Sequence, residues 1–289
     1  VFSSQRDFEK AERISQQVIA MWRKAPSAPE LQLASSLQNL GSILSQRGNH
    51  AKAELVLREA LAIRKKLTKG ADGQIVATLS CLGWALESQN KPKEAEAAYR
   101  EALDSQKELV GFEHSEVTVL LKAIARLHRQ QGRESESIAL YREAAEHGNA
   151  EAQLTLGRIY SRGRGVAKDA TEASKWYRMA TVQYRQKAEE GDSEAQNAFA
   201  WLLATCPVSE IRDGRSALAY AEKSVAATSR KESKYLETLA AAYAEAGEFA
   251  KAASVQKEAI PLLQDKEAER DFASRLKLYE SQTPYRDRD

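Results

Sequence analysis

The sequence predicts an all-α protein built as a stack of helical hairpins. Its first half has a period of 42 residues, at which small side chains recur. One position of this period is occupied by Ala11, Ala53, Ala95 and Ser137. A second pattern, Leu-x2-Leu-Gly-x2-Leu, occurs at 37–44 and again at 79–86. A fixed period of 20–50 residues indicates a repeat architecture, in which each unit packs on its neighbours and exposes an extended concave surface.

The composition is that of a globular protein. Hydrophobic residues make up 43% of the 289 residues and charged residues 29%, and Gly and Pro are not enriched. The formal net charge of +2 gives no bulk reason to expect a nucleic-acid partner. No run of 18 apolar residues occurs, so we expect no membrane insertion.

The two cysteines, Cys81 and Cys206, fall in different repeats and are expected to be free thiols. Free thiols mildly favour a reducing compartment, but a cytoplasmic and an exported protein both remain open. Because the sequence starts at Val1, without an initiator Met and inside a repeat, we expect a piece of a longer or processed protein.

The helices are expected in the following order. A first amphipathic helix covers 7–24, with a stub of its partner at 1–4, and Pro26 and Pro29 break it. Three hairpins follow, and their turns carry residue types that tolerate the left-handed conformation. These hairpins and turns are 32–68 with Gly48, 74–109 with Asn90, and 115–147 with Gly132.

The pattern changes at Gly148. Two glycines, Gly163 and Gly165, are expected to let a loop fold back before the next helix. Asp169 is expected to cap that helix at its start, and Glu172 to complete a capping box.

The last part of the chain contains further helical segments. A second start of the same type occurs at 191–196, a helix is expected over 214–228, and a hairpin runs from 235 to about 263. A charged helix over 266–280 has the half-polar character that caps a stack, and the tail from Thr283 is expected to be frayed.

These motifs resemble known repeat families. Residues 1–147 resemble tetratricopeptide repeats of the 42-residue kind found in kinesin light chains, on the Leu-x2-Leu-Gly core, the run at 94–102 and the linker at 111–117. The third repeat departs from the pattern, since Ala125 replaces Gly, His128 takes an apolar position and Ser137 replaces Ala. Residues 148–190 resemble a Sel-like repeat.

The resemblance also has implications for architecture and source. It implies a right-handed α/α solenoid with one continuous core, and residues 190–264 resemble C-terminal modules of bacterial tetratricopeptide proteins, which favours a bacterial origin. The expected domains are 1–147 (tetratricopeptide repeats, the first truncated), 148–190 (Sel-like), 191–264 (degenerate hairpins) and 265–289 (capping helix and tail).

Motifs for catalysis are lacking in the sequence. None of the four histidines pairs with another His or Cys at metal-ligand spacing. The run Arg-Gly-Arg-Gly at 162–165 lacks the Lys-Ser/Thr of a P-loop and a preceding strand. We therefore expect no enzyme, no metal and no cofactor.

The resemblance implies that the first helix of each hairpin lines a concave groove that binds a peptide. In this sequence the register gives polar side chains first, then one tryptophan, then five cations. The candidate groove residues are Gln38, Asn39, Ser42, Ser80, Trp84, Glu87, Lys122, Arg126, Arg129, Arg158 and Arg162. The five cations favour an acidic segment, with an apolar side chain near Trp84, although basic residues on helices are more often a solvated face.

The sequence therefore predicts a non-catalytic adaptor that binds a protein or peptide. Two alternatives stay open. One is a structural spacer or oligomerisation module of a larger protein, which could self-associate. The other is an RNA-binding helical repeat, which is less favoured because the cations are confined to the middle and the last hairpin carries Glu237 and Glu245.

Overall fold

A computed structural model describes residues 2–24 and 30–287, and these residues form fourteen α-helices, two short 3-10 helices and no strand. The all-α, helical-hairpin solenoid class predicted from the sequence is confirmed. The chain forms two compact units, Val1–Leu140 (unit 1) and Tyr141–Asp289 (unit 2).

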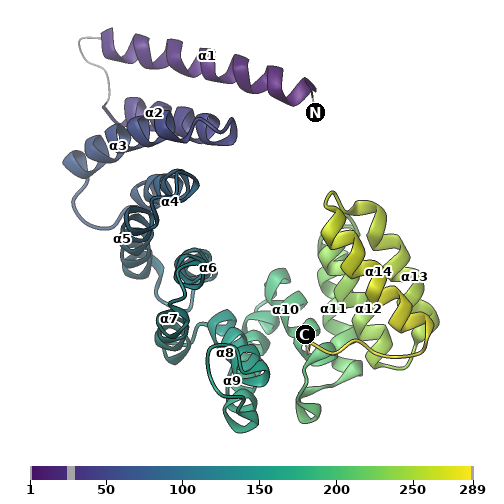
Figure 1. Ribbon diagram of the computed structural model, residues 1–289. Helices are drawn as coiled ribbons and strands as arrows, with labels where there is room; N and C mark the ends of the chain where they lie inside the picture. Colours follow the sequence, from purple (N-terminus) through teal and green to yellow (C-terminus); the bar gives the residue numbers. More distant parts are fainter. Residues whose placement is uncertain (1, 25–29, 288–289) are drawn as a thin grey trace. The chain divides into compact units, whose positions relative to one another are not determined.

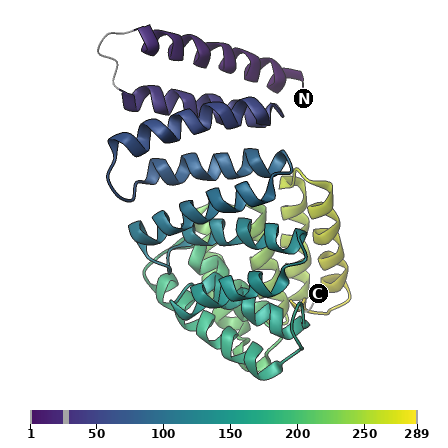
Figure 2. The ribbon, with the colours of Figure 1, turned by 60° about the vertical axis from the view of Figure 1, so that its left-hand side comes forward.

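In unit 1 the first six helices pack in chain order, each of the first five on the one that follows it, as Figures 1 and 2 show. The helices are α1 (Phe2–Lys24), α2 (Glu30–Gln46), α3 (His50–Leu67), α4 (Gly73–Ser88), α5 (Pro92–Val110), α6 (Ser115–Gln130) and the first part of α7 (Glu134–Glu146). The helix pairs expected over 32–68, 74–109 and 115–147 are therefore present within two residues of their expected ends.

The predicted turns have the predicted backbone. Gly48, Asn90 and Gly132 have φ angles of 78°, 58° and 71°, the left-handed region that Gly and Asn tolerate. One expectation is wrong: residues 2–4 are the start of α1 and not the stub of a partner helix, since no turn residue separates them from residue 7. The expected helix breakers Pro26 and Pro29 lie outside the described residues.

In unit 1 a glycine contact sets the distance between the two helices of a hairpin. A Cβ atom added to Gly41 would lie 2.5 Å from Cγ of Leu57, and one added to Gly83 would lie 2.6 Å from Cε1 of Tyr99. Leu57 and Tyr99 are buried on the second helix of each hairpin. The two helices therefore approach most closely where only a hydrogen side chain fits.

Unit 2 is a second stack of helices packed in chain order, with α10 also contacting α12. Besides the end of α7, its α-helices are α8 (Ala150–Arg162), α9 (Ala170–Glu189), α10 (Ser193–Thr205), α11 (Gly214–Ala227), α12 (Ser233–Glu245), α13 (Phe249–Ala259) and α14 (Lys266–Glu280). Short 3-10 helices lie at Ser209–Ile211 and Ile260–Leu262.

The loop between α8 and α9 follows the sequence prediction in part. Gly163 and Gly165 have φ angles of 72° and 70°, and the Asp169 carboxylate accepts hydrogen bonds from the backbone at the start of α9. The capping box is not formed: the Glu172 carboxylate accepts from Trp176 Nε1 at 3.1 Å. The backbone N–H of Asp169 donates instead to the Tyr160 carbonyl at 3.0 Å, and this bond closes the loop on α8.

The expectation of a frayed tail from Thr283 is also wrong. After α14 the backbone returns to α10, and the Asp287 N–H donates to the Thr205 carbonyl at 2.9 Å. Asp287 is only 8% exposed. The C-terminal segment is therefore a packed part of unit 2 as far as it is described.

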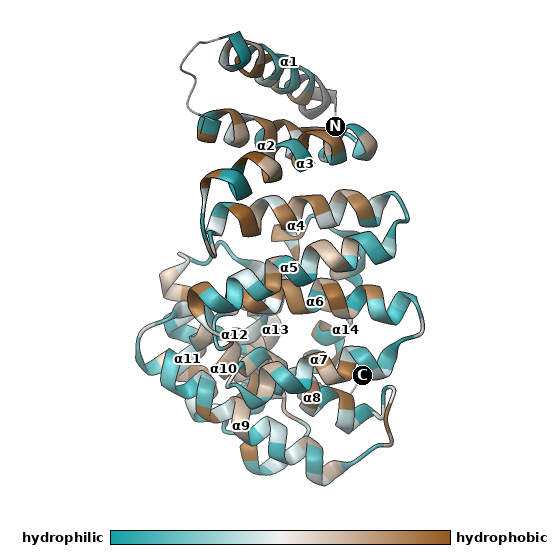
Figure 3. Cartoon of the chain, turned by 90° about the vertical axis from the view of Figure 1, so that its left-hand side faces the viewer, coloured by the Kyte–Doolittle hydropathy of each residue, from teal (hydrophilic) through white to brown (hydrophobic). Residues whose placement is uncertain are grey.

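Each helix contains both apolar and polar residues along its length, as Figure 3 shows. This pattern is expected of amphipathic helices that bury one side. Among the described residues, no helix combines the length and the apolar character needed to cross a membrane.

Candidate interaction surfaces

Unit 1 contains an open cavity between α4 and α6 with a volume of about 980 Å³. Its walls are mainly apolar and come from α4, the end of α5 and α6. They include Val76, Ala77, Leu109, Val110, Val119 and Leu120. Val119 is 69% exposed, although it faces this cavity. An exposed β-branched side chain in a concave apolar surface is the type of feature that marks an interaction site.

Three of the groove residues predicted from the sequence line this cavity, namely Ser80, Lys122 and Arg126. The Ser80 hydroxyl is already used within α4, where it donates to the Val76 carbonyl at 2.8 Å. Lys122 and Arg126 are exposed on α6, one helical turn apart. The cavity therefore has cationic side chains beside an apolar wall.

Glu87, another predicted groove residue, neutralises Arg126. The guanidinium of Arg126 donates from Nε to Glu87 Oε1 at 2.9 Å and from Nη2 to Glu87 Oε2 at 2.7 Å. These hydrogen bonds raise the pKa of Arg126, against the opposing effect of its burial. The bidentate pair connects α4 to α6, so an acidic ligand would have to compete with Glu87 for this arginine.

The remaining predicted residues of unit 1 differ in their surroundings. Gln38 accepts a hydrogen bond from the Thr78 hydroxyl, and Ser42 lies 3.6 Å from the Cys81 sulfur. Asn39 is exposed. Arg129 is exposed and makes no ion pair with the residues that the structure describes. Trp84 is 40% exposed, and its ring and the His50 ring form a T-shaped pair with a centroid distance of 5.7 Å.

In unit 2 the two predicted cations, Arg158 and Arg162, hold one carboxylate. Arg158 Nε donates to Asp287 Oδ2 and Arg162 Nη2 donates to Asp287 Oδ1, both at 2.7 Å. Burial lowers the pKa of Arg158, but Asp287 and Glu151 outweigh burial and raise it. Asp287 could not be identified from the sequence as the partner of the two arginines, because a polar segment after the last helix is expected to fray. The Pro-Tyr pair at 284–285 was the signal that this segment has an apolar anchor.

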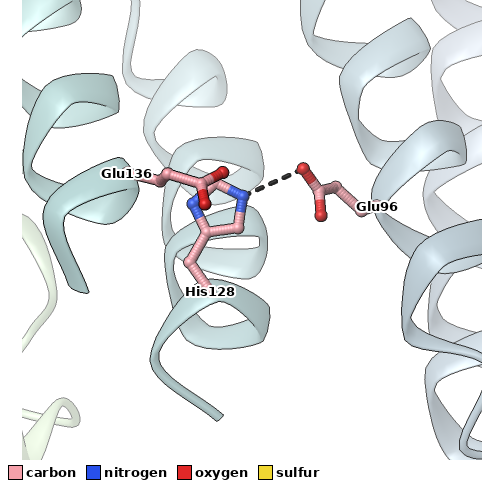
Figure 4. Close-up of side chains that lie close together, drawn as sticks. All are labelled: Glu96, His128 and Glu136. Atoms are coloured by element: carbon pink, nitrogen blue, oxygen red, sulfur yellow. Dashed lines mark hydrogen bonds and ion pairs between the residues drawn. The ribbon is translucent and has the colours of Figure 1, made fainter. Parts of the chain in front are cut away.

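A cluster of possible metal ligands lies elsewhere in unit 1. Glu96 of α5, His128 of α6 and Glu136 of α7 bring one ligand atom each within 4.8 Å of one another (Figure 4). His128 is fully buried, and its Nε2 lies 3.0 Å from Glu96 Oε1. This cluster could not be predicted from the sequence, since its three residues share no metal-ligand spacing.

Guanidinium groups already occupy the carboxylates of this cluster. Arg133 pairs with Glu96 and also donates to Glu136 at 2.8 Å, and Arg100 donates to Glu96 at 2.9 Å. Burial favours the protonated form of Glu96, but the hydrogen bonds from Arg133, His128 and Arg100 prevail and lower its pKa to about 2. A divalent cation would have to displace Arg133, so we interpret the cluster as an ion-pair network rather than a metal site.

The stacked hairpins and the open cavity on them are typical of a helical-repeat protein. A family model described as "Tetratricopeptide repeat" matches residues 1–66 and 74–150. This match agrees with the resemblance to tetratricopeptide repeats that the sequence motifs of residues 1–147 show.

Several solved structures are similar to this chain at low sequence identity. A tetratricopeptide repeat protein from Parabacteroides merdae ATCC 43184 is 18% identical, with 96% of this chain and 94% of that chain covered and a TM-score of 0.48. A Sel1 repeat protein from Oxalobacter formigenes is 19% identical, with 82% and 97% covered and a TM-score of 0.41. BtubC (BKLC) from P. vanneervenii is 18% identical, with 89% and 90% covered and a TM-score of 0.46. No curated protein matches the sequence.

Proposed function

We propose that this chain is a non-catalytic scaffold that binds a segment of a partner protein in the cavity between α4 and α6. Tetratricopeptide and Sel1 repeats generally serve as scaffolds for protein–protein interaction. The observation that carries the proposal is the open apolar cavity with the exposed Val119 on its wall.

The chemistry of the cavity favours an amphipathic segment. An apolar side chain of the ligand would cover Val119 and Leu109, which are both exposed in the free chain. An acidic side chain would meet Lys122, Arg126 and Arg129 on α6, and the Glu87–Arg126 pair would open to accept it. Trp84, one helical turn beyond Ser80, offers a second apolar contact.

The test uses the full chain and a pair of matched variants. A labelled peptide with alternating Leu and Glu residues is titrated with the wild type, with Val119→Glu and with Val182→Glu. Val182 lies in α9 of unit 2, is 63% exposed and is not among the residues that line the cavity, so this substitution makes the same chemical change at similar exposure. We expect Val119→Glu to weaken binding at least about tenfold, because it adds a charge to the apolar wall, and Val182→Glu to leave it unchanged.

Other outcomes would contradict the proposal. If both variants bind the peptide with the same affinity, the peptide binds outside the cavity. If the folded wild type does not bind the peptide at all, the cavity is not a site for acidic peptides. Binding of a random RNA at moderate salt, with loss of that binding in Arg129→Glu, would favour the RNA-binding alternative.

A further inference from the structure

Residues 285–287 lie against the C-terminal end of α10 in unit 2, to which the chain returns after α14 (Figure 1). The Asp287 N–H donates to the Thr205 carbonyl, and Arg286 Nη1 donates to the Ala204 carbonyl at 3.3 Å. The last carbonyls of a helix have no partner within the helix. The end of α10 thus binds this segment through its backbone carbonyls, which could accept hydrogen bonds from any other extended chain.

The three side chains of the segment contact three different groups. The Tyr285 ring lies 5.7 Å from the Trp201 ring and 4.8 Å from the Arg275 guanidinium. Arg286 pairs with Glu245 at 2.6 Å. Asp287 is held by the two arginines of α8. The surface thus selects, in order, an aromatic, a basic and an acidic residue.

The segment contributes little to the hydrophobic core of unit 2. Pro284, Tyr285 and Arg286 are half-buried, and only Asp287 is buried. The large buried apolar side chains of α10 and α12, such as Phe199, Leu202 and Leu236, belong to the helices themselves. Detachment of the segment would therefore leave the core covered, whereas Arg158 and Arg162 would lose their shared carboxylate. Arg158 and Arg162 are half-buried with the segment in place, and two such guanidinium groups without their carboxylate favour the binding of another one.

We propose that this surface is a peptide-binding site for a partner segment of the type aromatic–basic–acidic, and that residues 285–287 are its tethered occupant. The inference rests on the proposed scaffold function but concerns other residues, in unit 2. A short tether holds the occupant at an effective concentration on the order of millimolar, so a partner segment must bind better than the chain's own residues or arrive when they are released.

The test measures exchange of the tethered segment for a free one. A labelled, amidated peptide with the sequence of residues 281–287 is titrated with the full-length wild type and with the full-length variant Tyr285→Ala/Asp287→Asn, whose segment is released. We expect the variant to bind the peptide at least about tenfold more tightly than the wild type does. Adding Arg158→Gln and Arg162→Gln to the released variant should abolish binding. Asp104→Asn, which removes an exposed carboxylate paired with Lys107 in unit 1, should behave like the wild type.

Two results would overturn the proposal. One is a released variant with wild-type helicity that does not bind the peptide at millimolar concentration. The other is equal binding by the released variant and the wild type, which would place the peptide on another surface. The two proposals fail independently. If Val119→Glu abolishes binding of the Leu-Glu peptide but leaves binding of the 281–287 peptide unchanged, the effect concerns only the cavity of unit 1.

Hydrogen exchange of the wild type provides a test that needs no variant. The amide of Asp287 should exchange at least about 100-fold faster than the core amides of α12, because the segment opens without the helices, and the free peptide should accelerate it further. Protection of Asp287 equal to that of α12 would show that the segment is a fixed part of the fold.

Discussion

Replacement of Gly83 by Ala tests the hairpin geometry most directly. A Cβ atom at this position would lie 2.6–2.8 Å from three atoms of the Tyr99 ring. Tyr99 is 4% exposed and cannot swing into solvent. Overpacking of this kind typically costs about 1–3 kcal/mol, while Ala in a helix interior gains about 0.5–1 kcal/mol over Gly. We therefore expect Gly83→Ala to be destabilising by up to about 2 kcal/mol.

Gly73 of the same helix is the matched control for this substitution. Nothing lies within 4 Å of a Cβ atom at Gly73, and its backbone is compatible with Ala. Gly73→Ala should therefore be neutral or stabilising by a few tenths of a kcal/mol up to about 1 kcal/mol. Urea unfolding followed by circular dichroism would measure both free energies of unfolding.

A double-mutant cycle assigns the cost to the contact with Tyr99. In a Tyr99→Ala background the added Cβ atom has no ring to meet, so Gly83→Ala should lose most of its effect. If Gly83→Ala and Gly73→Ala changed the free energy of unfolding equally, the close approach of α4 and α5 at Gly83 would be refuted.

Three further predictions concern the charges and the connection at residues 145–150. Because hydrogen bonds lower the pKa of Glu96 from 4.5 to about 2, its ionised form stabilises the fold above about pH 4.5, and this contribution is lost as the pH falls through 2. The stability difference between wild type and Glu96→Gln should shrink by roughly 3 kcal/mol between pH 5 and pH 2, and a pH-independent difference would contradict this origin. Limited proteolysis should spare 145–150, because Asn149 and Gln153 are buried and bonded to the carbonyls of Ala144 and Ala145; rapid cutting there into two stable halves would show a flexible linker. Binding of the Leu-Glu peptide should weaken as salt rises and be lost in Arg126→Glu, and salt-independent binding would exclude the cationic side chains of α6 from the site.

The helix positions could be predicted from the sequence because local signals determine them. The turn residues Gly48, Asn90 and Gly132 need a left-handed backbone, and the 42-residue period fixes which faces are buried. The Leu-x2-Leu-Gly pattern located Gly83 in the sequence, but only the structure shows that the Tyr99 ring faces it.

The charge pairs could not be predicted in the same way. Glu87 and Arg126 are 39 positions apart, and Arg158 and Asp287 are 129 positions apart, so no local pattern relates them. The groove register identified which cations lie on the first helices of the hairpins, but not which carboxylates face them. The capping box at Glu172 failed for a different, local reason, since Trp176 one turn later donates to the same carboxylate.

The glycine contact has a consequence for how such chains change over time. It recurs in the hairpin of α8 and α9, where a Cβ atom at Gly157 would lie 2.8 Å from the Tyr177 ring, just as Gly83 of α4 meets Tyr99 of α5. The two hairpins thus share one internal spacing despite their different loops. A gene segment that encodes a whole hairpin brings both partners of this contact with it. Recombination between whole hairpins can therefore lengthen or reorder the chain and keep this contact, whereas a crossover within a hairpin separates the glycine from its partner.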